Sequence, residues 1–296
     1  RLDKSGIGCD GWPACYGQIG AAGDQTPTLG STYERLAREA KEPMSWATPV
    51  HRLVATVLGL LVVAMTLVSL RQRRDRLLPL LLLGLTAFLA WLGIYSEGLH
   101  NPAVVMGNLG GGFAMLGLLG WMVFRDARPR ANASGTVRRW VVAALVLLGI
   151  QIAIGGLISA NFAATACMTL PDCHGTWLPG SDLSTAFDLT RQHEIGPNGL
   201  ALGGAERADI HKLHRLVAVA TLLAVLIAGG LAMLGRMGLT ALFVIAVAAL
   251  EFSVGIATIL TDLPISIAVA HNWLAALLLL GLLRLFALCR NRQALL

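Results

Sequence analysis

Seven long runs of apolar residues make up most of the chain, and short polar links or two longer segments separate them. We place the runs at residues 50–70, 77–95, 102–124, 140–158, 213–234, 239–260 and 265–288. As a helix rising about 1.5 Å per residue, each run is long enough to cross a hydrocarbon core of about 30 Å. Seven such runs are not typical of the buried helices of a water-soluble protein, so the pattern predicts an all-α polytopic membrane protein.

Composition and charge agree with this prediction and orient it. Hydrophobic residues make up 55% of the chain and charged residues 14%, and the mean hydropathy is +0.67. Arginines gather in alternate links, which the positive-inside rule assigns to the cytoplasmic side: Arg71, Arg73, Arg74, Arg76, Arg125, Arg128, Arg130, Arg138, Arg139, Arg236, Arg290 and Arg292. This bias accounts for most of the net charge of +6, so nothing points to nucleic acid. Segments 1–49 and 159–212 then lie on the outer face of the membrane, expected to be a bacterial inner membrane.

A sequence duplication organises these elements. The letters HRLVA occur at residues 51–55 and again at 214–218, each time at the start of an apolar run. A second histidine, His271, follows His214 by 57 residues, whereas the residue 57 positions after His51 is Asn108. An apolar run precedes the second copy at 140–158 but has no counterpart before the first. We therefore expect that a first helix is missing from this sequence.

With that helix restored, the chain would have eight spans. An even number of spans per copy predicts two tandem four-helix bundles in parallel repeat, over residues 1–130 and 131–296. Two short helices are also expected in the outer segments, at residues 31–40 and 182–193.

Paired cysteines lie in both outer segments. Each pair has the spacing C-x5-C, and an oxidising location favours disulfides over thiols. Zinc is the rival interpretation, although its ligands usually have the spacing C-x2–4-C. We expect the disulfides Cys9–Cys15 and Cys167–Cys173, and a free thiol at Cys289.

The two histidines of the second copy are candidate iron ligands. Ionisable residues inside spans usually face the interior of the bundle, and two imidazoles from different helices suit axial ligation of a heme iron. His214 and His271 each lie near the outer end of a span. The alternative is a pair of histidines that merely make hydrogen bonds. His211 shares the helical face of His214 and could replace it as the ligand.

Further polar residues border these positions. Arg52 and Arg215 follow the two HRLVA histidines and could pair with heme propionates or reach the lipid headgroups. Glu251, in the middle of a span, could handle protons near the heme or make a hydrogen bond that packs helices. His100 borders the N-terminal site, whereas His174 and His193 are expected to be ordinary surface residues.

These motifs together resemble those of the heme A synthase family of cytochrome oxidase assembly. The resemblance covers nearly the whole chain, and no single motif would be specific. The segments that carry it are residues 9–17 (CDGWPACYG), both HRLVA segments, residues 102–111 (PAVVMGNLGG), residues 155–161 (GGLISAN), residues 211–215 (HKLHR) and the run that contains His271.

The resemblance implies a fold and a reaction. It implies two four-helix bundles, each with a histidine pair near the outer face. The C-terminal pair, His214 and His271, would hold a heme b, and the N-terminal bundle, with His51, would take heme O as substrate. The C8 methyl group of heme O would be oxidised to the formyl group of heme A, with electrons relayed from an external donor through heme b.

The chain departs from the family pattern in its N-terminal half. Thr48 replaces the usual glutamate three residues before His51, and Asn108 replaces the partner histidine. An amide is a poor heme ligand compared with imidazole. One-sided ligation by His51 would leave iron an open position for oxygen activation, or it would mark a paralogue that handles heme without catalysis. Expected partners are heme O synthase, other oxidase assembly factors and the lipid bilayer; the electron donor and a homo-oligomer stay open.

Overall fold

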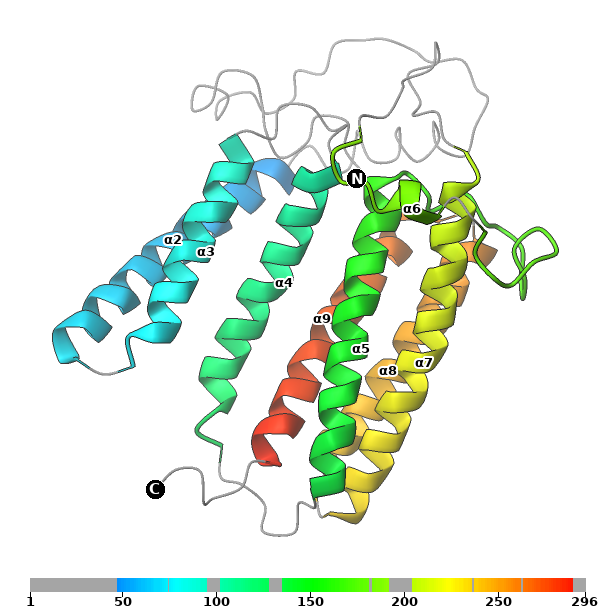
Figure 1. Ribbon diagram of the computed structural model, residues 1–296. Helices are drawn as coiled ribbons and strands as arrows, with labels where there is room; N and C mark the ends of the chain where they lie inside the picture. The colour runs from blue at the N-terminus through cyan, green and yellow to red at the C-terminus, as the bar shows by residue number, and fades with distance from the viewer. Residues whose placement is uncertain are drawn as a thin grey trace. The chain divides into compact units, whose positions relative to one another are not determined.

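The computed structural model describes residues 47–73, 75–94, 102–127, 135–180, 183–191, 204–235, 237–261 and 263–289, and over this part of the chain it is all-helical (Figure 1). The helices are α2 (Ala47–Gln72), α3 (Leu77–Ile94), α4 (Pro102–Phe124), α5 (Gly135–Ala160), α6 (Leu183–Ala186), α7 (Glu206–Leu234), α8 (Gly238–Leu260) and α9 (Ile265–Leu288). All except α6 are long and apolar enough to cross a membrane. The predicted all-α polytopic membrane fold is confirmed.

Two helices extend beyond the apolar runs that predicted them. The fourth run was expected to begin at residue 140, but α5 begins at Gly135, and α7 begins at Glu206 instead of residue 213. An apolar run marks the length of a helix inside the membrane, whereas a helix continues wherever its polar residues find partners or water. The helix predicted at 182–193 was wrong in its length, because α6 ends at Ala186 and turns follow. The one predicted at 31–40 lies outside the described residues.

The chain divides into two compact units, Arg1–Met115 and Leu116–Leu296. The predicted division at residues 130 and 131 stays a prediction. In the first unit, α2 packs against α3, and the Thr66 hydroxyl donates to the Pro79 carbonyl across this contact at 3.1 Å. Helices α3 and α4 approach closely at Gly107, where an added Cβ would lie 2.6 Å from a Leu92 methyl.

Four helices of the second unit form a closed bundle. Helix α5 contacts α7, α7 contacts α8, α8 contacts α9, and α9 returns to α5. Figure 1 shows α7 and α9 running in one direction and α5 and α8 in the other. Small and branched residues fill the centre, including Val141, Ala144, Val225, Ala228, Val244 and Leu282. This part of the structure matches a four-helix bundle, the architecture in which cofactors are held by side chains from facing helices.

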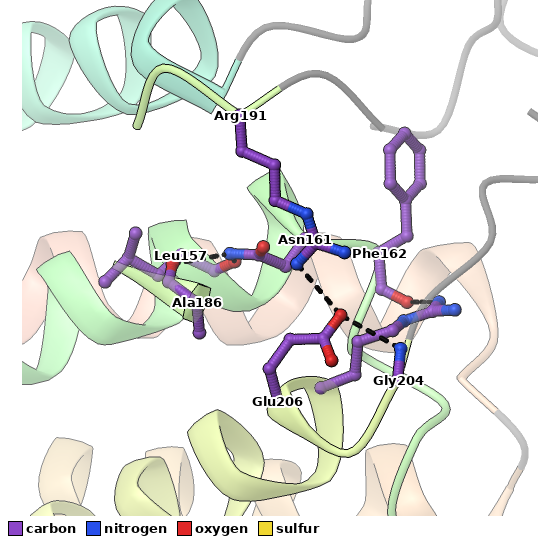
Figure 2. A network of polar contacts seen from close by, with 8 residues as sticks. Leu157, Asn161, Phe162, Ala186, Arg191, Gly204 and Glu206 are labelled. Atoms are coloured by element: carbon purple, nitrogen blue, oxygen red, sulfur yellow. Dashed lines mark hydrogen bonds and ion pairs between the residues drawn. The ribbon is translucent and has the colours of Figure 1, made fainter. Parts of the chain in front are cut away.

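A polar network joins the ends of α5, α6 and α7 at one end of this bundle (Figure 2). The Asn161 amide donates to the Leu157 carbonyl at 2.9 Å and to the Ala186 carbonyl at 3.0 Å. The Glu206 carboxylate accepts from Arg191 at 2.9 Å and from the Gly204 N–H at 3.0 Å, and these bonds tie the first residue of α7 to the segment before it. Arg207 also donates to the carbonyl of Phe162. These bonds explain why α7 can begin before its apolar run.

Candidate functional site

The two candidate ligands of the second unit lie near the starts of helices that run in the same direction. His214 lies eight residues after Glu206 in α7, and His271 lies six residues after Ile265 in α9. Both imidazoles are partly buried. Each packs against a neighbouring helix near that helix's C-terminal end, so the predicted pair falls at one end of one bundle.

His214 packs on α5. The amide nitrogen of Gln151 lies 3.1 Å from the His214 Nε2. One helical turn further along, a Cβ added to Gly155 would lie 3.3 Å from the His214 Cε1, so the ring rests directly on the glycine. The His214 Nδ1 is buried and makes no hydrogen bond. A buried ring nitrogen without a partner is costly unless another group uses it, which fits a ligand position.

His271 packs on α8 in the same manner. Its Nδ1 lies 3.2 Å from a carboxylate oxygen of Glu251, an ion-pair distance, although neither atom completes a hydrogen bond. A Cβ added to Gly255 would lie 3.2 Å from the His271 Cε1. The Glu251 side chain is only 15% exposed, so its carboxylate meets the imidazole in surroundings with little water.

The surroundings of the two histidines repeat each other. Gln151 and Gly155 on α5 have the spacing Q-x3-G, and Glu251 and Gly255 on α8 have the spacing E-x3-G. Residues four apart lie on one face of a helix, so the polar side chain and the glycine face the ring together. Sequence reasoning singled out Glu251 but missed Gln151, Gly155 and Gly255. The signal was the recurrence of a polar residue and a glycine at this spacing near the ends of two spans.

His211 lies on α7, one turn before His214, and is 7% exposed. Its side chain meets the backbone of Ala163, and its Nδ1 makes no hydrogen bond. The contact with Ala163 directs this imidazole to the segment that follows α5. His214, by contrast, contacts two residues within α5, so the two histidines have different neighbours.

Arg215 holds the cysteine-containing segment instead of lying open to solvent. Its guanidinium donates to the carbonyls of Thr169, Asp172 and Cys167 at 2.8, 2.9 and 2.6 Å. Cys167 and Cys173 are buried, and their Cα atoms lie 5.3 Å apart, within the range of about 4.4–6.8 Å that a disulfide spans. Neither the headgroup contact nor the propionate contact predicted for Arg215 anticipated these three bonds.

A separate cavity of about 420 Å³ opens between this segment and the start of α7. None of the predicted iron ligands lines it; its lining residues are Thr165, Ala166, His174, Gly204, Ala205, Arg207 and Ala208. His174 lies on this lining with its Nε2 3.1 Å from the Ala166 carbonyl oxygen.

The candidate residues of the first unit are arranged differently. His51 is exposed near the start of α2, and Asn108 is partly buried in α4. The offset of 163 residues that relates His51 to His214 also relates Phe88 to Glu251 and Leu92 to Gly255. Apolar side chains thus occupy the positions of the carboxylate and the glycine. Arg52 lies beside His51 in α2, whereas His100, Cys9 and Cys15 lie outside the described residues.

Metal sites of the zinc or di-iron type are not indicated among the described residues. In the part of the chain that is described, no three His, Cys, Asp or Glu side chains come together. Two imidazoles are nevertheless the number of protein ligands that a six-coordinate heme iron takes. The buried Nδ1 of His214 and the two glycine contacts fit such a group.

Comparisons with known proteins decide the family. The family described as "Cytochrome oxidase assembly protein" matches residues 1–283. Over 291 residues the chain is 35% identical to the "Heme A synthase" of Shewanella oneidensis, covering 95% of this chain and 88% of that protein. The chain belongs to the heme A synthase family. The "Heme A synthase" of Caulobacter sp. (strain K31) is 26% identical over 94% of this chain and 86% of its own length, and that of Caulobacter vibrioides gives the same figures.

Family membership and the seven apolar helices together make this an integral membrane protein. The heme A synthase resemblance derived from the motifs is confirmed. The roles of the individual residues stay predictions, since membership in the family does not assign them.

Proposed function

We propose that the chain is a membrane oxidoreductase of heme A biosynthesis. Its relatives carry the name heme A synthase, and the chain covers most of their length. In this proposal, heme O is the substrate, and its C8 methyl group is oxidised to the formyl group of heme A. Heme O synthase and other oxidase assembly factors are the expected partners, and the reaction is proposed to take place toward the outer face of an inner membrane.

The observation that carries the proposal is the pair of matched imidazoles in the second unit. His214 and His271 would hold a heme b between α7 and α9, each backed by a glycine and a polar side chain of a neighbouring helix. A heme b at this place supplies one-electron transfer. The chain's own residues would exclude lipid, orient the two rings and keep their ligating nitrogens available. Residues 131–296 are thus the proposed heme b half, and residues 1–130 the proposed substrate half.

Ligand substitutions test the heme b site. His214→Ala and His271→Ala should each abolish or convert a low-spin bis-imidazole spectrum of the purified full-length protein. His174→Ala is the matched control, because His174 lies in the outer segment and contacts backbone. Should only His211→Ala erase the spectrum, the ligand moves to His211. A normal low-spin spectrum in all three of His211→Ala, His214→Ala and His271→Ala would contradict the site.

A non-catalytic role in heme handling is the second candidate. Three residues of the first unit favour it, because Asn108 takes the position of His271, and the apolar Phe88 and Leu92 take those of Glu251 and Gly255. The predicted catalytic roles of His51 and Glu251 remain predictions under either candidate. Co-expression with a source of heme O, followed by chromatographic heme analysis, separates the two. Heme A formed only with intact protein supports a synthase, whereas heme O without oxidised product supports heme handling.

A further inference from the structure

The two candidate ligands have partners of different charge, and this difference is the basis of a further inference. We propose that Glu251 and Gln151 are paired positioning residues that make the two axial ligands unequal, with His271 the stronger electron donor to iron and His214 the weaker. The proposal rests on the proposed heme site and deepens it.

The geometry of the pairs is the first support. Glu251 lies 3.2 Å from the His271 Nδ1, and Gln151 lies 3.1 Å from the His214 Nε2. In each case the glycine one turn later allows the ring to rest against the helix backbone, at 3.2 Å for Gly255 and 3.3 Å for Gly155. The glycine sets how closely the ring approaches the helix, and the polar side chain meets one ring nitrogen. The two helices therefore each supply a glycine and a polar side chain to one ring, although Glu251 lies at the Nδ1 of His271 and Gln151 at the Nε2 of His214.

The chemistry of the two partners is the second support. A carboxylate near the non-ligating ring nitrogen of a metal-bound histidine fixes the ring and raises its basicity. An amide is uncharged and therefore acts more weakly. Both pairs lie inside spans, where a low effective dielectric constant strengthens the difference. A more basic axial ligand stabilises ferric over ferrous iron, so Glu251 should hold the reduction potential of the heme lower than two amide partners would.

The alternative role for Glu251 is helix packing alone. The chain offers little support for it: the described contacts of the Glu251 carboxylate are with His271, which is the candidate ligand itself. A packing residue would not need to meet a ring nitrogen, nor would its position repeat at Gln151. Gln151 contacts His214 without carrying a charge, so a charged and an uncharged partner of a histidine can be compared within one bundle.

Reciprocal substitutions test the proposal in the full-length protein as purified with its heme. Glu251→Gln should move the midpoint potential of the low-spin heme to a more positive value, and Gln151→Glu should move it to a more negative value. Both variants should keep the low-spin spectrum, since the ligands are unchanged. Asp188→Asn is the matched control: it removes one carboxylate from an exposed turn after α6, and it should leave the potential at the wild-type value.

The outcomes are distinct. A low-spin heme whose potential in Glu251→Gln equals that of Asp188→Asn overturns the positioning role but leaves the heme site intact. The proposed heme site, and this inference with it, is overturned if the wild-type protein has no low-spin heme. It is also overturned if a low-spin heme remains when both histidines are replaced. If Glu251→Gln does not accumulate, Gln151→Glu decides alone: a shift to a more negative potential supports the inference, and no shift or a positive one overturns it.

Discussion

The glycines beneath the two imidazoles are the residues on which the candidate site depends most directly. Gly155 and Gly255 lie under His214 and His271, where a Cβ added to either glycine would crowd the ring at 3.3 and 3.2 Å. The recurrence of a polar residue four positions before each glycine was a weak signal among the 33 glycines of this chain, because that spacing does not show which ring packs on the helix. Only the packing of a ring from another helix distinguishes them.

We therefore expect Gly155→Ala to lower the heme content of the protein while leaving its helix content nearly unchanged. The new Cβ would lie 3.3 Å from the His214 Cε1, and the ring would have to move. Overpacking a tight contact costs about 1–3 kcal/mol, so heme occupancy at limiting heme should fall by about tenfold. Titration of the purified protein with heme, followed by its absorbance spectrum, measures this.

The control for this change is Gly149→Ala on the same helix. No atom lies within 4 Å of a Cβ at that position, so heme occupancy should be unchanged. Equal loss of heme in both variants would show that α5 tolerates no added methyl group, and would remove the special role of Gly155.

We expect the thiol of Cys289 to be hard to label in the folded protein. The residue follows α9, is 1% exposed, and its sulfur lies 3.8 Å from that of Met237. Burial raises the pKa of this thiol from 9.0 to about 11, even though Arg138 acts in the opposite direction. The thiolate is the reactive form, so maleimide labelling at pH 8 should be slow in the native protein and fast in detergent-denatured protein. Rapid labelling of native Cys289 would contradict its burial.

At the scale of elements, the apolar runs predicted the spans well but predicted poorly where α5 and α7 begin. Hydrophobicity marks the part of a helix inside the membrane, whereas the first three turns of α7 are held by Glu206, by Arg207 and by the bonds of Arg215 to the preceding segment. Most of these partners lie more than ten positions before α7 in the sequence, and Gly204 belongs to the turn just before it. No local sequence pattern therefore reveals them. The start of α7 thus depends on tertiary contacts.

Arg215→Ala should loosen the segment between α5 and α6 without unfolding the bundle. Three carbonyls, those of Cys167, Thr169 and Asp172, would lose their donor. Hydrogen bonds to a charged group are worth about 1.5–3 kcal/mol each, so deuterium uptake over residues 167–173 should rise clearly. Hydrogen exchange with mass spectrometry reads this segment directly.

Arg139→Ala is the comparison, since Arg139 is an exposed residue of α5 and its loss changes the net charge equally. Unchanged exchange over residues 167–173 in Arg215→Ala would contradict the bonds that the structure places there. A loss of the low-spin heme in Arg215→Ala would add support to the predicted contact with propionates.

The cysteine pairs give a prediction about oxidation state. Protein isolated without reductant and then denatured should react with a maleimide at Cys289 only, because Cys9–Cys15 and Cys167–Cys173 are expected to be disulfides. After reduction, all five cysteines should react, and mass mapping assigns each one. Labelling of Cys167 and Cys173 before reduction would count against the second disulfide, and Cys289 serves as the internal control for access.

At the scale of the whole molecule, duplication is the feature that the sequence revealed most clearly. The two copies nevertheless differ at the candidate heme site, where the first copy lacks the residues of the second. The offset between the two HRLVA segments aligns Asn108 with His271, Leu92 with Gly255 and Phe88 with Glu251. In the first unit, a Cβ added to Gly107 would lie 2.6 Å from a Leu92 methyl, so α3 and α4 pack directly on each other there. Counting residues could reveal Asn108, but the tight contact at Leu92 could be seen only in the structure.

We therefore expect at most one tightly held low-spin heme per chain, in the second unit. Asn108→His should change the first unit little by itself, because Leu92 and Phe88 leave no glycine and no carboxylate beside the new ring. Leu92→Gly combined with Asn108→His should raise heme content further than either change alone. Pyridine hemochrome analysis against protein concentration measures the ratio. Two low-spin hemes in the wild-type chain would contradict this account of Asn108.

The closed ring of four helices has a consequence for how the protein is made. Helix α9 is the last of the four in chain order, it completes the ring by returning to α5, and it carries His271. While the chain is still emerging from the ribosome, α5, α7 and α8 can insert and pair, but the second imidazole has not yet arrived. Docking of α9 therefore completes the bundle, and we expect capture of heme between the two histidines to await it.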